Sequence, residues 1–117
     1  MKKPLTLSSG LFWNIYADWT IIERERLNQS YLAALQTLAE LLQKQAQPEQ
    51  ALAICQRALE YDPTFEAAYS LSMQVHHRMG DRASVIRTYQ ACTEALQRQI
   101  GLPPSKETEQ LYRRLIA

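Results

Sequence analysis

Residues 30–63 read SYLAALQTLAELLQKQAQPEQALAICQRALEYDP, and this stretch contains one full copy of a unit that the chain uses twice. Shifting the sequence by 34 residues places its apolar and small residues on comparable residues further along. The matched pairs are Leu35 with Tyr69, Ala46 with Gly80, Ala51 with Val85, Cys55 with Tyr89, and Ala58 with Cys92. We therefore expect residues 30–63 and 64–97 to form two helical hairpins of the same hand.

This period is that of tetratricopeptide repeats, in which two antiparallel helices lie close together. The first unit resembles such a repeat because small residues stand where the helices approach and a proline closes it: Ala39, Ala51, Ala58 and Pro63. The second unit, residues 67–96, keeps Tyr69, Gly80 and Tyr89. It is degenerate, since the bulkier Met73 and Val85 replace small residues and no proline closes it. Each repeat buries its apolar face only against a neighbour, and two repeats have few neighbours. We therefore expect the extra turns of the first helix and the last helix to cap the two ends of the pair. A plain helical bundle is the alternative.

The predicted fold class is all-α, a tetratricopeptide-repeat-like superhelix of about five helices in antiparallel hairpins, because apolar residues recur at helical spacing and no stretch alternates with period two. The first helix is expected from Asp18, its N-cap, to Gln45. Its apolar residues form one stripe, namely Ile22, Leu27, Tyr31, Leu35, Leu38 and Leu42.

Capping and helix-breaking residues set the other helix boundaries. The later helices are expected at residues 49–60, 64–79, 81–100 and 105–117. The expected N-caps are Thr64, Asp81 and Ser105, and Pro48 is expected in the first turn of its helix. Extended links are expected at Asp62-Pro63 and Pro103-Pro104. Gly80 and Gly101 are expected to end helices in left-handed turns. Glu107 and Glu109 then lie in the first turn of the last helix, where the helix dipole favours carboxylates.

Composition and charge limit the possible domain organisation and function of the chain. The 117 residues suit one domain over residues 1–117, with an aromatic lead-in at 1–17, two repeat hairpins at 18–100 and a capping helix at 101–117. A hydrophobic fraction of 46% and a charged fraction of 21% are typical of a soluble globular protein. The formal net charge is +1, so we expect no direct nucleic-acid binding by this chain.

Localisation and redox state follow from simple patterns. No apolar run approaches the length of about 18 residues that a membrane span needs, and the start is too polar for a signal peptide. We therefore expect a cytoplasmic protein with no membrane contact. Cys55 and Cys92 lie in apolar helical surroundings, and we interpret both as small, reduced core residues.

Two further motifs carry a family resemblance. Asp18-Trp19 precedes Glu23-Arg24-Glu25-Arg26-Leu27, and the chain ends with Gly101-Leu102-x-Pro104-Ser105-x-Glu107-Thr108-x-x-Leu111-Tyr112. With the hairpins between them, residues 11–116 resemble the bacterial transcriptional activator domain found behind the winged-helix DNA-binding domain of antibiotic-regulatory activators. The resemblance implies an all-helical effector module that contacts the DNA-binding domain, the transcription machinery or a second copy, without catalysis or cofactor. No winged-helix pattern precedes the match, so we expect a fragment of a longer regulator or a freestanding module.

Residues that suggest enzyme chemistry or a metal site have simpler interpretations. His76 and His77 are adjacent, so their side chains point about 100° apart on a helix, which is unsuitable for two ligands of one metal. We expect His76 to be a partly buried packing residue. The sequence has no glycine-rich phosphate loop, and no serine or cysteine has a recognisable base partner. The alternation of Glu23 and Glu25 with Arg24 and Arg26 predicts a solvated face with weak ion pairs rather than a DNA contact.

A peptide-binding groove is the alternative function, as in a general repeat adaptor. The first helix of each repeat would line its concave face with Gln36, Glu40, Gln43, Lys44, Ser70, Gln74, His77 and Arg78. A clamp for a peptide C-terminus needs positive charge, which Gln36, Glu40, Ser70 and Gln74 do not supply. Such a clamp is disfavoured, whereas binding of other peptides is not.

The N-terminal segment contains four large aromatic residues within eight positions: Phe12, Trp13, Tyr16 and Trp19. They either cap the core or form a partner site. Trp19 is in line with Ile22 and is the expected core member. Phe12, Trp13 and Tyr16 remain as candidates for docking to a neighbouring domain or for self-association as a homodimer.

Overall fold

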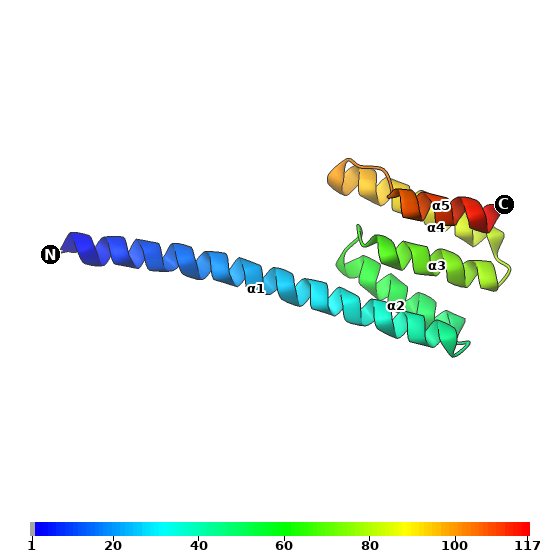
Figure 1. The fold of residues 1–117 in the computed structure, drawn as a ribbon, viewed down its shortest axis with the longest axis horizontal. Helices are drawn as coiled ribbons and strands as arrows, with labels where there is room; N and C mark the ends of the chain where they lie inside the picture. The colour runs from blue at the N-terminus through cyan, green and yellow to red at the C-terminus, as the bar shows by residue number, and fades with distance from the viewer. Residues whose placement is uncertain (1) are drawn as a thin grey trace. The chain divides into compact units, whose positions relative to one another are not determined.

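The computed structural model describes residues 2–117, with side chains from residue 10 onward. It has five helices, shown in Figure 1: α1 (Lys2–Lys44), α2 (Pro48–Tyr61), α3 (Glu66–Arg78), α4 (Arg82–Ile100) and α5 (Lys106–Ile116). No strand occurs in residues 2–117. The chain divides into two compact units, one ending at Tyr31 and the other running from Leu32 to Ala117. The all-α prediction with five helices is confirmed.

The expected start of the first helix is wrong. The helix begins at Lys2, so Asp18 lies in its interior rather than at its N-cap, and residues 2–17 are helical. Ser8, Ser9 and Gly10 do not interrupt it. A glycine inside a helix costs only about 1 kcal/mol, so this run of residues does not have to end a helix.

The expected apolar stripe of α1 is also wrong in part. Leu35 is buried, but Ile22, Leu27, Tyr31 and Leu38 are exposed. The buried residues of α1 are instead Leu32, Leu35 and Ala39. Tyr31 and Leu38 each come one residue before a buried residue, and successive side chains on a helix point about 100° apart, so both turn away from the buried face.

The helix ends follow most of the capping predictions. Pro48 lies in the first turn of α2, and Gly101 ends α4 with φ 67°. The side chain of Asp81 accepts a hydrogen bond from the Ser84 N–H (3.1 Å), and Ser105 accepts one from the Thr108 N–H (3.3 Å). These N-caps are confirmed.

Thr64 does not cap α3, so that prediction is wrong. The N-cap position is Phe65, without a side-chain hydrogen bond. The Thr64 N–H and hydroxyl donate instead to Oδ1 of Asp62, at 3.0 and 2.7 Å. An aspartate that accepts from the residue two positions on forms a local turn, and this turn competes with helix capping for Thr64.

The two turns that join the helices of each hairpin have the same hydrogen bonds. In the first, Ala46 N–H donates to the Gln43 carbonyl (3.1 Å) and Gln47 N–H to the Leu42 carbonyl (2.9 Å). In the second, 34 residues on, Gly80 N–H donates to His77 (3.0 Å) and Asp81 N–H to His76 (2.9 Å). Ala46 and Gly80 both have positive φ, 58° and 77°. The sequence offset therefore pairs equivalent backbone positions at both turns.

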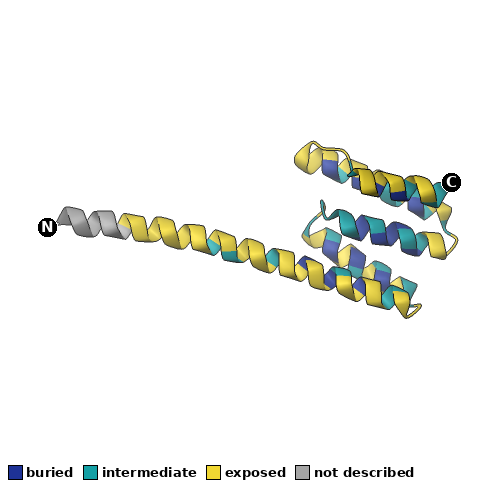
Figure 2. Ribbon diagram, in the orientation of Figure 1, coloured by how far each residue is buried: buried dark blue, intermediate teal, exposed yellow. Residues whose placement is uncertain are grey.

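The core lies within residues 32–117 and has three clusters, marked by the buried residues of Figure 2. The first joins α1, α2 and α3 and includes Cys55 and Ala58. The second joins α3 and α4 through Tyr69, Cys92 and Leu96. Both cysteines are buried and free, which confirms their interpretation as core residues.

The third cluster shows what the bulkier residues of the second repeat do. Met73 and Val85 are fully buried against Leu111 of α5. The rings of Tyr89 and Tyr112 stack nearby, with centroids 3.9 Å apart and planes inclined by 3°. Larger side chains at these positions therefore extend the core far enough to hold α5 against α3 and α4.

Candidate protein-contact surfaces

The aromatic residues near the start of α1 form a cluster on the surface of the helix. Phe12 stacks on Tyr16 (centroids 6.4 Å apart), Trp13 meets Tyr16 edge-on (5.8 Å), and Tyr16 lies 6.5 Å from Trp19. Phe12, Ile15, Tyr16 and Trp19 line an open hollow of about 210 Å³. We call these four residues, with Ile22 one turn further on, the aromatic stripe.

The aromatic stripe is exposed. The exposed fraction is 64% for Phe12 and 57% for Trp19. The prediction that Trp19 is a buried core residue is wrong. Trp19 makes a ring contact with Tyr16 of its own helix, and neighbours on one helix shield a side chain only in part.

Charged residues are sparse in residues 10–22 and frequent directly after them. Asp18 is the one ionisable acid or base of residues 10–22, tyrosine aside. Glu23 and Arg26 then form an exposed salt bridge of 2.7 Å, and the hydrogen bond and charge of Glu23 raise the pKa of Arg26. This ion pair within the helix agrees with a solvated face, and exposed pairs of this kind contribute little stability.

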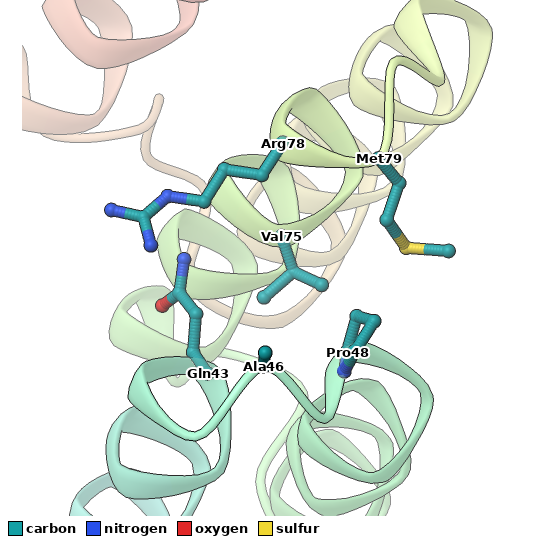
Figure 3. A pocket seen from close by; sticks show the side chains of 6 residues that line it. All are labelled: Gln43, Ala46, Pro48, Val75, Arg78 and Met79. Carbon is teal, nitrogen blue, oxygen red and sulfur yellow. The ribbon is translucent and has the colours of Figure 1, made fainter.

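Three of the predicted groove residues line a cavity together with α5. Gln74, His77 and Arg78 surround about 270 Å³ with Leu111, Arg114 and Leu115. Arg78 also lines a second cavity, of about 300 Å³, with Gln43. The other walls of this second cavity are Ala46, Pro48, Val75 and Met79 (Figure 3). We call the first the basic cavity and the second the apolar cavity.

The remaining predicted groove residues line neither of these two cavities: Gln36, Glu40, Lys44 and Ser70. Sequence reasoning missed Met79 and Arg114. Met79 follows α3 and was assigned to a helix end, while Arg114 lies in α5, which the 34-residue period does not cover.

Glu66 fixes α5 beside α3. Its Oε2 accepts hydrogen bonds from the Ser105 N–H (3.0 Å) and the Thr108 hydroxyl (2.7 Å). Partial burial opposes ionisation of Glu66, but these hydrogen bonds outweigh it and lower the pKa below its ordinary value. The starts of α3 and α5 therefore lie together, and the last turns of both helices meet at the basic cavity.

The cysteines and histidines do not form a reactive centre in the described part of the chain. Burial raises the pKa of Cys92 to about 12 and also raises that of Cys55, so both remain thiols at neutral pH. His76 is half-buried, as expected of a packing residue, and its buried Nδ1 has no hydrogen-bond partner. Residues 10–117 contain no group of three potential metal ligands among His, Cys, Asp and Glu.

Comparison with known proteins identifies one family. Residues 9–116 match the family model of the bacterial transcriptional activator domain. No curated protein and no solved structure matches the chain. Among the described residues, no helix is both long and apolar enough to cross a membrane.

Proposed function

We propose that this chain, which belongs to the bacterial transcriptional activator domain family, serves transcription regulation through contacts with other proteins. The family is regulatory, and the proposal assigns the chain neither catalysis nor a cofactor. A regulator of bacterial transcription acts in the cytoplasm, where the proposal places this chain.

The aromatic stripe is the observation that carries this proposal. Burying one aromatic side chain contributes about 1.5 to 3 kcal/mol, so several exposed rings on one helix favour association. Asp18 is the only charge among residues 10–22, so an uncharged apolar helix is a better partner than a charged surface. A second copy of the chain offers such a helix, with residues 12, 15, 19 and 22 at the alternating spacing that paired helices use.

The experiment compares the assembly state of the chain with that of the variant Phe12→Ser/Trp13→Ser by sedimentation equilibrium. We expect weaker self-association, with helical content and melting temperature nearly unchanged, because both side chains are exposed. Ile21→Ser is the matched control: Ile21 is equally exposed but takes no part in the ring contacts of Phe12, Trp13 and Tyr16, and its replacement should leave assembly intact.

Two results would contradict self-association. One is an unchanged assembly state in the double variant, and the other is a much lower melting temperature, which would assign the aromatics to the fold. If the chain is monomeric and binds a winged-helix domain through Phe12 and Trp13, the partner of the aromatic stripe is a neighbouring domain and not a second copy of the chain.

Direct DNA binding is not part of this role. With a net charge of +1 the chain can release few counterions from a duplex, so we expect only weak, nonspecific affinity that falls with salt. A gel-shift titration with this chain alone tests this. A tight, sequence-specific shift would overturn the protein-contact proposal.

A second candidate function is peptide binding by the first helices of the repeats. The observation that favours it is the pair of adjoining cavities, which share Arg78 and include Gln43, Gln74 and His77 from the expected groove.

A further inference from the structure

The apolar and basic cavities differ in chemistry although they share a wall. Figure 3 shows Gln43 and Arg78 at one side of the apolar cavity and Pro48 and Met79 at the other. Val75 and Ala46 lie between them. The cavity therefore offers an apolar end and, at the opposite end, an amide and a guanidinium.

The basic cavity shares Arg78 with the apolar cavity and adds two further basic residues, His77 and Arg114. His77 and Arg78 come from the last turn of α3, and Arg114 comes from the last turn of α5. No acidic side chain lines either cavity. Within residues 10–117, neither arginine forms a salt bridge: the ion pairs involve Arg26 and Arg113. Two arginines without a salt bridge and one histidine thus line one space.

We propose that the two cavities together bind an internal acidic segment of a partner protein, with one apolar side chain in the apolar cavity and adjacent carboxylates on Arg78 and Arg114. Guanidinium groups pair with carboxylates through two parallel hydrogen bonds, and Met79 provides an adaptable apolar wall. This inference deepens the second candidate function and is independent of the aromatic stripe.

The apolar cavity favours a peptide over a nucleic acid. A duplex keeps its bases stacked inside, so its phosphate backbone would meet Arg78, Arg114 and His77 and leave the space walled by Val75, Pro48 and Met79 unfilled. A peptide supplies both an apolar side chain and a carboxylate at neighbouring positions.

The experiment titrates the full chain, labelled for NMR, with a short, terminally blocked peptide whose central leucine is flanked by glutamates. We expect shifts concentrated at Ala46, His77, Met79 and Arg114. Replacing the leucine by serine, or the glutamates by glutamines, should each weaken binding by about tenfold, because each change removes one of the two contacts. Shifts spread over the surface, or equal binding of the altered peptides, would overturn the proposal.

Variants of the chain separate binding from folding. Arg78→Glu should weaken binding by tenfold or more, and Arg114→Gln by several-fold. Arg98→Glu is the matched control, since Arg98 also lies in the last turn of a helix but lines neither cavity. Equal losses for Arg78→Glu and Arg98→Glu would mean a general charge effect and overturn the site. Arg114→Gln tests the same site without reversing a charge in α3.

Two further measurements test the peptide-binding proposal independently of the self-association proposal and of nucleic-acid binding. Phe12→Ser/Trp13→Ser should bind the peptide as the unaltered chain does, because its substitutions lie outside both cavities. A short DNA duplex should not displace the peptide; displacement that depends on Arg78 would assign the basic cavity to phosphate and overturn the peptide proposal.

Discussion

Residues 11–31 and residues 32–117 contain similar apolar side chains in opposite environments. In the first region Leu27, Ile22 and Trp19 are exposed, whereas in the second Leu96, Val85 and Met73 are fully buried. Residues 11–31 belong to one continuous helical segment, whereas within residues 32–117 several helices cover one another's apolar sides. Apolar content alone therefore does not determine burial; a second apolar face must lie opposite.

Amide hydrogen exchange gives the largest expected contrast between the two regions. In the dilute monomer, amides of residues 12–28 should exchange almost without protection, because a lone helix is only marginally stable in water. Amides of residues 69–75 should open with free energies nearer the global value, at least about 5 kcal/mol. NMR-detected exchange measures both. Equal protection in both regions would refute the contrast, and protection of residues 12–28 that rises with protein concentration would support helix pairing.

The next largest effect concerns equivalent truncations in the two regions. Leu96→Ala should reduce the free energy of unfolding by about 3 kcal/mol, since the side chain is fully buried in the α3–α4 cluster. Leu27→Ala, in the exposed part of α1, should change it by less than about 0.5 kcal/mol. Urea titration followed by circular dichroism gives both values. A large loss in Leu27→Ala would show that the first region is packed in solution.

Glu66→Gln tests the attachment of α5 within the second region. We expect a loss of about 1 kcal/mol at neutral pH, because a neutral amide oxygen replaces the carboxylate that Ser105 and Thr108 hold.

The pH dependence of this effect has a definite sign. The folded pKa of Glu66 is lowered below its ordinary value of 4.5, so its contribution is present above that pH and is lost as pH falls below it. Thermal melts from pH 6 to pH 3 should therefore show the difference between Glu66→Gln and the unaltered chain shrinking. A constant difference would contradict the hydrogen-bond assignment, and Glu60→Gln, an exposed site, is the control.

The smallest effects compare the two hairpin turns. Gly80→Ala should destabilise the fold by about 1 kcal/mol, because an alanine at φ 77° is strained even though a Cβ would meet no neighbour. Ala46→Gly should stabilise it by about 0.5 kcal/mol, since the relief of strain at φ 58° exceeds the added entropy of the unfolded chain. Changes of the same sign in the two variants would show that the turns are not equivalent.

Local sequence signals predicted the elements whose causes are themselves local. Asp81 and Ser105 cap helices through their own neighbours, and Gly101 ends α4 because it adopts a left-handed conformation easily. The 34-residue offset identified equivalent turns at Ala46 and Gly80. Thr64 was mispredicted where two local patterns competed, an N-cap and a turn on Asp62.

The sequence by itself determined the helices of residues 48–117 and their connections, because prolines, glycines and capping side chains act within a few residues. Tertiary structure decided which faces are covered. Trp19 and Ile22 have the spacing of a core stripe, but no other helix covers them in their own unit. Arg114 and Arg78 line one cavity because the Leu111 cluster and the hydrogen bonds of Glu66 hold α5 beside α3. Helical periodicity specifies which side chains share a face, and only contact between helices decides whether that face is buried, paired or open to a partner.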